Sequence, residues 1–460
     1  MNPVQTIEYS FPPEVERVFE AFERENIQIY LVGGPVREIL RGCAEGLNDF
    51  DFATPTSAEQ TARILRKAGI RPIPIGVAFG TVGAVLDSLR IDITTFRREE
   101  EYKPRSRHPE VDFGGTIEED LRRRDFCMNA IAMTRSGELI DPFDGLKDIR
   151  NKHISTPGDP ERIFSDDPLR LLRAARFVSQ LGYVVVPSVK KVARKMAFLI
   201  TAVSRERWKM EMDKLLLGDY VHKGLDYLFE SNLLTFMMPE LTVIKGFDQT
   251  DQYHHKDVWE HTKRALRAAA KQADVRWAVL LHDIGKPYTH SVEDGQVHFY
   301  HHETVGETLA RSIMFRFKFS NEQRKKVSSL ILNHMRPNMY DDGWSDSAVR
   351  RLARDLRGNV FDLIDVSRAD ITSMRPETVR RGLARLEKLR KRLEEVLRED
   401  TRQPPLPKGM GTAIMEHFGI EEGPEVGTYM KMLNKAIDDG ILEPGREYEY
   451  YLDYLEQKKQ

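Results

Sequence analysis

Hydrophobic and polar residues follow two different periods along the chain, and the change between them divides the sequence. Up to about residue 150, short apolar and β-branched runs alternate with segments whose apolar residues recur every three or four positions. The runs predict strands, and the longer-period segments predict helices. Strands are expected within 27–34, 49–54 and, as a pair around a turn, 79–97, and helices within 1–24, 35–42 and 57–69. This alternation predicts a mixed α/β domain over residues 25–150.

From about residue 160 the pattern turns helical and stays helical. Segment 165–182 (SDDPLRLLRAARFVSQLG) begins with a Ser/Asp cap and continues with apolar residues at helical spacing. Residues 377–400 predict an amphipathic or short coiled-coil helix, with apolar residues at 379, 383, 386, 393 and 397. The Pro-rich stretch 401–411 is the clearest linker. The sequence contains no internal repeat and no low-complexity tract.

Composition narrows the class of protein. A chain of 460 residues is expected to form about two to four domains. No apolar run reaches the ~20 residues that span a bilayer, and the N-terminus lacks a signal-peptide layout, so no membrane partner is expected. Only Cys43 and Cys127 are present, which excludes a disulfide framework and favours a reducing cytoplasm. Nothing in the sequence indicates an obligate protein partner.

Charge is balanced overall but uneven along the chain. The net charge is -2, yet residues 170–209 contain ten Lys or Arg and one acid, Glu206. A block this basic is either a surface for a polyanion or the solvated face of a helix, and charge alone does not choose between them.

Two aspartates in the stretch LNDFDFAT are the first candidates for chemistry. Asp49 and Asp51 are two residues apart, so on a strand they point the same way, and Phe50 and Phe52 pack on the other face. The pair is either the polar face of an ordinary strand or a site that holds a cation between like charges. Mg²⁺ prefers carboxylate oxygens, and Asp92 in another alternating strand offers the third carboxylate that two-metal phosphoryl transfer uses.

A glycine turn precedes these aspartates. Gly33 and Gly34 stand between a predicted strand and a helix, where the backbone can approach a phosphate closely and the helix N-terminus favours an anion. Arg37, one turn into that helix, can add a charge-assisted contact. The order of strand, glycine turn, short helix and DxD strand within about 30 residues is more specific than any one part.

Five ordered motifs resemble those of one enzyme family. They are LVGGPVREIL, NDFDFAT, TFRREEEYKPRSRHPEV, EEDLRRRDFCMNAIA and DDPLRLLRAARF. The sequence resembles the class II tRNA nucleotidyltransferases, which comprise the CCA-adding enzymes and their bacterial poly(A) polymerase relatives. The resemblance is close over residues 27–215 and looser to the C-terminus, where 419–433 is similar to a tail segment of several members. Two positions differ but keep their charge: Glu38 stands where the family has Asp, and Asp166 where it has Glu.

The resemblance implies roles for individual residues. It makes Asp49, Asp51 and Asp92 the catalytic acids, with the first two holding Mg²⁺. It also implies that the loop 98–109 helps to switch specificity between CTP and ATP, and that Asp167 and Arg170 read the edge of the base. The remaining positions matching the family's substrate site are Gly33, Gly34, Arg37, Arg124, Asp125, Arg173 and Arg176.

Base chemistry supports a protein template. A carboxylate accepts from the amino group of cytosine or adenine, while a guanidinium donates to ring acceptors, so one Asp–Arg pair can serve both bases and reject uracil and guanine. The ordinary alternative for single residues is that Arg173 and Arg176 are solvated and that Arg124 pairs with the nearby acids of EEDL.

Histidines form a second cluster, with eight of the thirteen between 254 and 302. The order H…HD…H…H…D resembles the HD phosphohydrolase superfamily. The resemblance assigns a metal set of His261, His282, Asp283 and Asp370, and a second pair of His302 and His334, with His301 competing for the place of His302. Imidazole and carboxylate together suit Mn²⁺, Fe²⁺, Ni²⁺ or Zn²⁺, which would activate water for phosphoester hydrolysis. His254, His255, His290 and His298 are taken as ordinary histidines.

These observations predict an α/β nucleotidyltransferase head of the polymerase β type followed by helical domains. The expected division is head 1–152, helical neck 153–235, HD-type domain 236–375 and helical tail 376–460. The expected activity is template-independent addition of CCA, or part of it, to the 3′ end and acceptor arm of tRNA from CTP and ATP with Mg²⁺. The alternatives are a poly(A) polymerase, an enzyme that adds only CC or only A, and a metal-dependent phosphohydrolase acting through the HD region.

Overall fold

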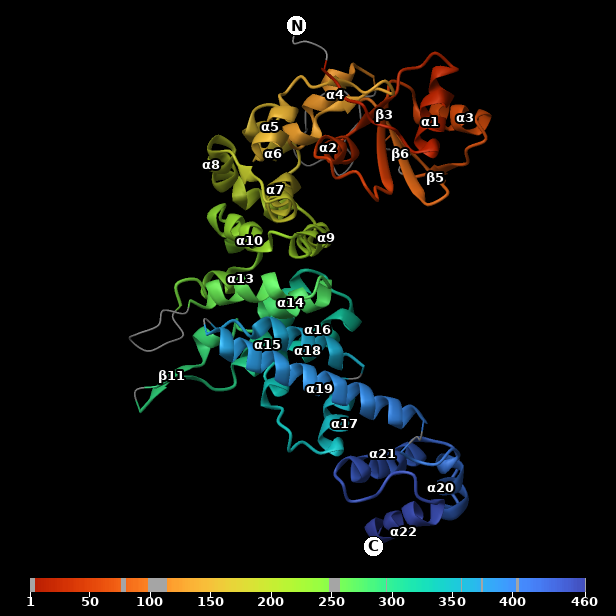
Figure 1. Ribbon diagram of the computed structural model, residues 1–460, viewed down its shortest axis with the longest axis vertical. Helices are drawn as coiled ribbons and strands as arrows, with labels where there is room; N and C mark the ends of the chain where they lie inside the picture. Colours follow the sequence, from red (N-terminus) through yellow and green to blue (C-terminus); the bar gives the residue numbers. More distant parts are fainter. Residues whose placement is uncertain are drawn as a thin grey trace. The chain divides into compact units, whose positions relative to one another are not determined.

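The computed structural model describes residues 5–75, 80–97, 114–247, 257–294, 296–356, 358–373, 375–402 and 405–459. The chain divides into two compact units, Met1–Met237 and Met238–Gln460 (Figure 1). The first holds an α/β sheet followed by helices, and the second is largely helical, which confirms the predicted fold class. The loop 98–109 and the histidines at 254 and 255 lie outside the described residues.

An eight-stranded sheet forms the head, in the order β1-β8-β7-β2-β3-β6-β5-β4. Its strands are β1 (Gln5–Thr6), β2 (Tyr30–Val32), β3 (Asp49–Thr54), β4 (Pro72–Pro74), β5 (Thr81–Leu86), β6 (Leu89–Thr95), β7 (Ala132–Met133) and β8 (Glu138–Ile140). Only β3 and β6 pair in parallel; every other neighbouring pair is antiparallel. The helices of the head are α1 (Pro13–Glu23), α2 (Gly34–Leu40), α3 (Ala58–Lys67), α4 (Ile117–Arg122) and α5 (Gly145–Asn151).

Local sequence explains most of these boundaries. In β3, Phe50 and Phe52 are fully buried while the two aspartates face the other way, as the alternation predicts. Helix α3 begins after Ser57, whose side chain accepts from the N–H of Gln60. The expected helix over residues 1–24 is shorter than predicted, because α1 begins at Pro13, and proline favours the first turn of a helix.

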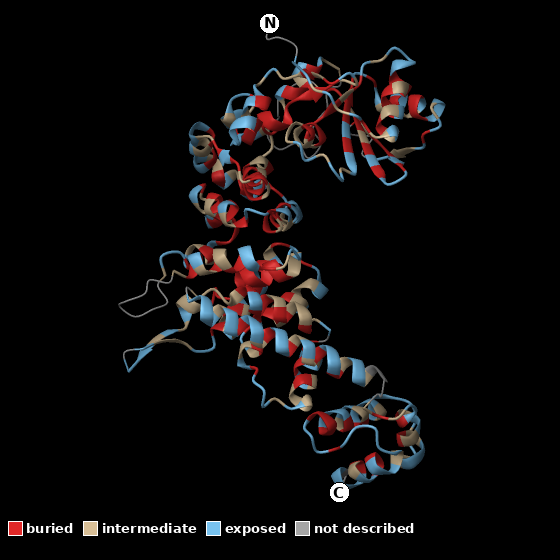
Figure 2. Cartoon of the chain, viewed as in Figure 1, coloured by how far each residue is buried: buried red, intermediate tan, exposed pale blue. Residues whose placement is uncertain are grey.

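Helices form the neck, residues 153–237, after a short parallel strand pair. The strands are β9 (His153–Ile154) and β10 (Val184–Val185). The helices are α6 (Pro160–Asp166), α7 (Leu169–Leu181), α8 (Pro187–Met196), α9 (Arg205–Leu216), α10 (Val221–Glu230) and α11 (Leu233–Met237). Helix α7 packs against both α9 and α10, and Figure 2 shows it as one of the most buried helices of this unit. Its arginines therefore lie close to buried elements rather than on a free surface.

The second unit is built from helices and one hairpin. The helices are α12 (Pro239–Thr242), α13 (Val258–Ala268), α14 (Ala273–Leu281), α15 (His302–Arg316), α16 (Asn321–Asn333), α17 (Asp346–Asp355), α18 (Val360–Asp370), α19 (Pro376–Arg402), α20 (Met410–Phe418), α21 (Pro424–Asp438) and α22 (Tyr448–Lys459). The hairpin of β11 (His290–Glu293) and β12 (Gln296–Phe299), like strand β10, departs from the expectation that the chain stays helical after residue 160. An Asp-Gly pair between two short alternating runs was the available signal for it.

The long helix and the linker that follows it also differ in detail from the prediction. In α19 the buried residues are Leu386, Leu389, Leu393 and Val396, a seam spaced by three and four residues, whereas Leu383 is exposed. Leu406 of the expected linker is buried in the core cluster of the tail formed by α20, α21 and α22. In the part of the chain that the structure describes, no helix combines the length and apolar character needed to cross a bilayer.

Candidate functional site

The three acids predicted as catalytic, Asp49, Asp51 and Asp92, lie on one face of the adjacent strands β3 and β6. In the parallel pairing of β3 with β6, Asp51 is opposite Asp92, and Asp49 is opposite Arg90. Arg90 donates to Oδ2 of Asp92 at 3.0 Å. Oδ1 of Asp92 is buried without a hydrogen-bond partner among the described residues. A buried carboxylate oxygen in that state is stabilised by a cation, which fits a metal site at this edge.

The electrostatics of Asp51 support the same reading. Its carboxylate faces a cavity, but the cavity walls desolvate it and so raise its pKa above the ordinary value. Arg124 opposes this shift, while the negative charges of Asp92 and Asp49 increase it. Three carboxylates gathered on one face of two strands are suited to Mg²⁺, which prefers hard oxygen ligands.

The glycine turn gives these carboxylates access to the cavity. Gly33 precedes α2 with φ +74°, a conformation that favours glycine. A Cβ at Gly33 would lie 3.1 Å from Nη1 of Arg124 and 3.8 Å from Oδ2 of Asp51. The absence of a side chain at Gly33 therefore keeps open the space between the guanidinium of Arg124 and the carboxylate of Asp51. Gly34 begins the helix, and a Cβ there would lie 3.9 Å from Nη2 of Arg37.

Arg37 is held from several sides. Its Nε donates to Glu38 at 2.9 Å, its Nη1 donates to Oδ1 of Asn129, and its guanidinium lies 5.1 Å from the centre of the Phe177 ring. Glu38 also pairs with Arg41, so the glutamate at this position still serves as an anchor for arginines.

Arg124 contacts both an acid of its own helix and the glycine turn. Its Nη2 donates to Oδ2 of buried Asp120 at 3.0 Å. Burial would raise the pKa of Asp120, but Arg124 and Arg123 hold it below its ordinary value. The alternative that Arg124 pairs with an acid of EEDL is therefore observed. It does not remove Arg124 from the site, because its Nη1 still reaches the turn at Gly33.

Asp125 links the head to the neck. Its Oδ1 accepts from the backbone N–H of Phe126 and from Nδ2 of Asn129, and its Oδ2 accepts from Nε of Arg173 at 2.8 Å. Burial would raise its pKa, but Arg173 and Asn129 together lower it to about 2. Asp125 is therefore an ionised carboxylate whose two oxygens both accept hydrogen bonds, and it positions Arg173.

A second buried acid continues this chain of charges. Glu211 of α9 contacts Arg176 at 3.2 Å and Arg173 at 3.8 Å. Burial and the nearby Arg173 lower the pKa of Arg176 to about 10, despite Glu211. Arg176 also lies 4.2 Å from the centre of the Phe177 ring. The idea that Arg173 and Arg176 are only solvated does not hold, since both make ion pairs and Arg176 is buried.

The expected base readers have other partners in this structure. Oδ1 of Asp167 accepts from the backbone N–H of Leu169 at 3.1 Å, and its Oδ2 accepts from Arg207 at 3.0 Å. Arg170 donates to the backbone carbonyls of Ile163 and Arg123. Asp167 is thus paired with Arg207 of α9 and not with Arg170.

One cavity of about 820 Å³ collects these residues. It is lined by every predicted head and neck residue except Asp92, and its charged lining consists of nine Lys or Arg and four Asp. Such an excess of cations suits a polyphosphate. Sequence reasoning missed seven polar or charged lining residues: Thr94, Arg97, Arg123, Asn129, Gln180, Arg207 and Lys214. Arg207 lay within the noted basic block, but its contact with Asp167 spans 40 positions and has no local signal.

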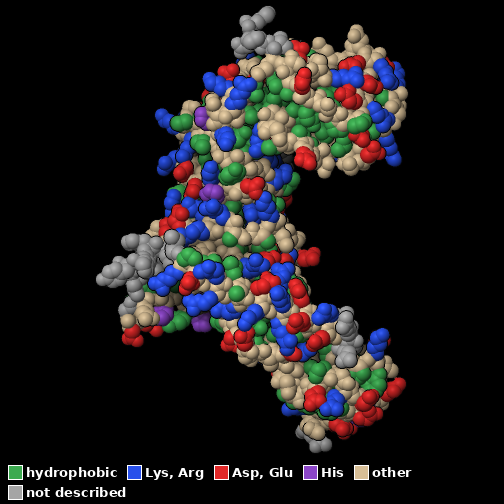
Figure 3. Space-filling view, viewed as in Figure 1, with side chains coloured by type: hydrophobic (Ala, Val, Ile, Leu, Met, Phe, Trp, Pro, Cys, Tyr) green, Lys and Arg blue, Asp and Glu red, His purple; other side chains and the backbone are tan. Residues whose placement is uncertain are grey.

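Much of the basic block is neutralised within the first unit. Its pairs include Arg173 with Asp125, Arg176 with Glu211, Lys190 with Glu230, Lys195 with Glu161, Arg207 with Asp167, and Lys209 with Asp213. Figure 3 accordingly shows Lys and Arg side chains interspersed with Asp and Glu over these helices. Part of the block is therefore an internal scaffold, and only the remainder is available to a polyanion.

The second unit brings four histidines and two acids together. His261, His282 and Asp283 form one group of potential metal ligands, and Asp283, His302 and His334 form another. The Oδ2 atom of Asp283 lies 3.3 Å from Nε2 of both His261 and His282, and its Oδ1 lies 3.6 Å from Nε2 of His302. Asp283 therefore faces both groups.

Hydrogen bonds orient three of these imidazoles inward. Nδ1 of His282, His302 and His334 donates to a backbone carbonyl three residues earlier, at 2.7, 2.9 and 2.7 Å. Each Nε2 atom is thus directed at the centre, as in proteins whose histidines bind metal. The Nε2 atoms of His302 and His334 are 3.3 Å apart, a contact that a cation or a shared proton must stabilise. The donor set fits a transition metal.

Asp370 completes the first group. Its Oδ1 lies 2.9 Å from Nε2 of His261 and 3.3 Å from Nε2 of His282. Although burial opposes it, Asp283 and Asp370 raise the pKa of His282 to about 10, whereas burial and the positive His282 lower that of His334 to about 4. Exposed His301 does not enter either group.

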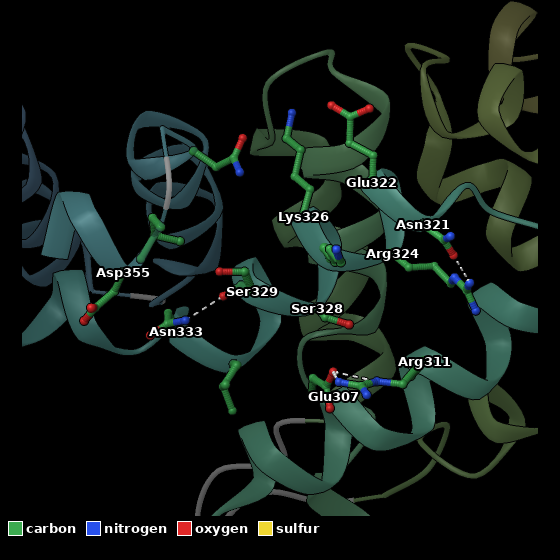
Figure 4. A pocket seen from close by; sticks show the side chains of 14 residues that line it. Glu307, Arg311, Asn321, Glu322, Arg324, Lys326, Ser328, Ser329, Asn333 and Asp355 are labelled. Atoms are coloured by element: carbon green, nitrogen blue, oxygen red, sulfur yellow. Dashed lines mark hydrogen bonds and ion pairs between the residues drawn. The ribbon is translucent and has the colours of Figure 1, made fainter. Parts of the chain in front are cut away.

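A larger hollow in the second unit lies over α15 to α18 and contains none of the predicted site residues. Its volume is about 990 Å³. Figure 4 shows that its side chains largely bind one another: Arg311 pairs with Glu307, Arg324 with Asn321, and Asn333 with the carbonyl of Ser329. Because no group of potential metal ligands found among the described residues lies there, size alone does not make it a candidate site.

Comparison with family models places both sites in known kinds of domain. Residues 29–155 match the "Poly A polymerase head domain", 182–245 the "Probable RNA and SrmB- binding site of polymerase A", and 254–374 the "HD domain". An α/β head with clustered carboxylates, joined to helical domains of these kinds, defines a nucleotidyltransferase.

Individual relatives narrow this class. The chain is 39% identical over 228 residues to a CCA-adding enzyme of Anoxybacillus flavithermus, covering 50% of this chain and 56% of that enzyme. It is 30% identical over 423 residues to an A-adding tRNA nucleotidyltransferase of Deinococcus radiodurans, covering 88% of this chain and 90% of the relative. The crystal structure of the Bacillus stearothermophilus CCA-adding enzyme in complex with CTP superposes with a TM-score of 0.70 and 26% identity, covering 98% of this chain and 99% of that one. The chain belongs to the class II family of CCA-adding enzymes and poly(A) polymerases.

Proposed function

We propose that this protein is a template-independent tRNA nucleotidyltransferase that adds CCA, or part of it, to tRNA 3′ ends from CTP and ATP. The observation that carries the proposal is the cavity in which catalytic carboxylates face an excess of arginines. Clustered carboxylates suit metal-assisted phosphoryl transfer, and the guanidinium groups suit the triphosphate. The relatives named above, which are CCA-adding and A-adding enzymes, support the same assignment.

In the proposed reaction the acids of strands β3 and β6 bind the metal, and arginines of the head bind the triphosphate. Asp49, Asp51 and Asp92 would hold Mg²⁺, which lowers the pKa of the attacking hydroxyl and neutralises the leaving pyrophosphate. Arg37 and Arg124, fixed by their own ion pairs, orient the triphosphate so that its α-phosphorus is in line with the tRNA 3′-hydroxyl. Their fixed geometry reduces the entropy that ordering the substrate would cost.

Base selection falls to the neck. Asp167 and Arg170 stand on the rim of the cavity, where a carboxylate accepts from an exocyclic amino group and a guanidinium donates to ring acceptors. Arg173 and Arg176 support this helix through Asp125 and Glu211. The exposed cations of the basic block on α8, such as Lys191 and Arg194, form the surface proposed for the tRNA phosphates.

The experiment uses the full chain with tRNA transcripts that end before CCA, after C and after CC. Each CTP, ATP, UTP or GTP is supplied singly and in mixtures with Mg²⁺, and the ends are sequenced. Ordered addition of C, C and A supports the CCA-adding assignment, whereas a response limited to the CC end supports A-only addition. A-only addition is tested because the Deinococcus relative, which matches 88% of this chain, is an A-adding enzyme. Long A tails would instead indicate a poly(A) polymerase.

The variant Asp51→Ala is expected to abolish incorporation, because it removes a ligand from the metal site while leaving the basic tRNA surface intact. A gel-shift assay should show unchanged tRNA binding. Incorporation at equal rates by Asp51→Ala and the unaltered enzyme would contradict the assignment of the head as the catalytic unit.

A second activity, metal-dependent phosphohydrolysis, is favoured by the convergence of inward-facing imidazoles around Asp283. A bound Mn²⁺, Fe²⁺, Ni²⁺ or Zn²⁺ would supply activated water there. Hydrolysis of cyclic or terminal phosphate esters that survives Asp51→Ala and is lost in His282→Ala would support it. Hydrolysis that is lost in Asp51→Ala would assign the reaction to the head instead.

A further inference from the structure

Arg207 lies beside the expected base reader and has no assigned role. It is in the first turn of α9 and lines the cavity, and its Nη2 donates to Oδ2 of Asp167 at 3.0 Å. Arg170 donates to two backbone carbonyls, and within the described residues the guanidinium bonded to the carboxylate of Asp167 is the one from α9.

Asp167 is therefore held at both oxygens. Leu169 fixes Oδ1 through its backbone N–H at 3.1 Å, and Arg207 fixes Oδ2. A carboxylate oxygen has two lone-pair sites, so an oxygen that accepts from Arg207 can still accept from an amino group of a nucleotide. With both ends held, the carboxylate keeps one orientation toward the cavity.

The solvent exposure of the Arg207–Asp167 ion pair indicates that it orients a side chain and adds little to the stability of the fold. The side chain of Arg207 is 49% exposed and that of Asp167 is 33% exposed. Ion pairs this open to water contribute little to stability, because water screens the charges and holding two long side chains costs entropy. The contact is thus better suited to orienting Asp167 than to holding α7 against α9, which pack through buried apolar residues.

We propose that Arg207 is a specificity-determining positioning residue: it holds the carboxylate of Asp167 so that amino-bearing bases are accepted and bases with a carbonyl at that edge are rejected. This inference rests on the proposed function of the cavity. A fixed carboxylate repels a carbonyl oxygen, whereas one that is free to turn can move away from it and lose the penalty. Removal of Arg207 therefore lowers discrimination more than it lowers affinity for CTP or ATP.

The test measures binding of CTP, ATP, UTP and GTP to the full chain without tRNA, by calorimetry or fluorescence competition. For Arg207→Ala we expect the ratio of Kd for UTP to Kd for CTP to fall about tenfold, the effect typical of losing one charge-assisted hydrogen bond. Arg207→Lys keeps a donor and should recover part of the ratio. Lys223→Ala, at an exposed lysine of α10 outside the cavity, is the matched control and should leave the ratio unchanged. The melting temperature should be the same in all variants.

The outcomes distinguish the inference from the proposed function. If the unaltered protein distinguishes neither CTP from UTP nor ATP from GTP, both fail. If it distinguishes either pair, and Asp167→Ala loses the distinction while Arg207→Ala retains it in full, only the role of Arg207 is overturned. Equal weakening of all four nucleotides in Arg207→Ala would also overturn it, because that result indicates simple attraction of the triphosphate.

Discussion

The carboxylate of Asp125 offers the sharpest test of how the head is joined to the neck. It is 7% exposed and binds Arg173 of α7 together with Asn129 and the backbone N–H of Phe126. The variant Asp125→Asn keeps the shape but removes the negative charge, and it leaves the guanidinium of Arg173 facing an amide. We expect this change to destabilise the junction.

The pKa supplies the magnitude. Asp125 has its pKa lowered from 3.8 to about 2, because Arg173 and Asn129 outweigh the effect of burial. At 1.36 kcal/mol for each unit, the ionised form is favoured in the folded state by about 2 to 3 kcal/mol, or about 60-fold. Because the folded pKa is depressed, this stability is present above pH 4 and is lost as the pH falls from about 4 to about 2.

Cys127, two residues away, reports opening of this junction. Its thiol is buried, whereas the other cysteine, Cys43, is exposed and can be replaced by serine. The labelling rate of Cys127 at pH 8, in urea below the unfolding transition, follows the free energy of opening. We expect labelling in Asp125→Asn to be faster by up to about 60-fold, the factor given by the pKa shift.

A matched variant controls for the chemistry of the substitution. Asp87 is exposed in the turn between β5 and β6, so Asp87→Asn should change the labelling rate by less than about twofold, the effect usual for a surface substitution. An Asp125→Asn rate within threefold of the unaltered protein would refute the reasoning, because the ion pair would then not hold the junction closed.

Two further predictions concern the metal centre and the thiols. Nδ1 of His261 lies 2.7 Å from Oγ1 of Thr372, and this hydroxyl orients the imidazole. Thr372→Val should therefore weaken binding of Mn²⁺ or Zn²⁺ at least about tenfold in equilibrium dialysis, whereas Thr372→Ser should not. Equal affinity in the two variants and the unaltered protein would show that the hydroxyl has no such role. Burial raises the pKa of Cys127 to about 12. At pH 8 a disulfide reagent should therefore react rapidly only with Cys43 until the protein is unfolded. Rapid reaction of both thiols would contradict the burial of Cys127.

Much of the fold was predictable because its signals are local. Strand β3 spans the predicted residues, since the alternation of aspartate and phenylalanine specifies both the strand and its two faces. Helix α3 begins at its serine cap for the same reason. The hairpin of β11 and β12 was missed although its turn residues were visible, because the helical period on either side dominated the interpretation.

The sequence by itself determined which residue types are available for chemistry and in what order they occur. Only the tertiary structure placed Asp92 opposite Asp51, paired Asp125 with Arg173, and brought Arg207 to Asp167. It also selected His302 over its neighbour by turning that imidazole toward His334. The physical reason is distance along the chain. Caps and periodicity act within a few residues, whereas these contacts join residues 32 to 48 positions apart and depend on how buried helices and strands pack.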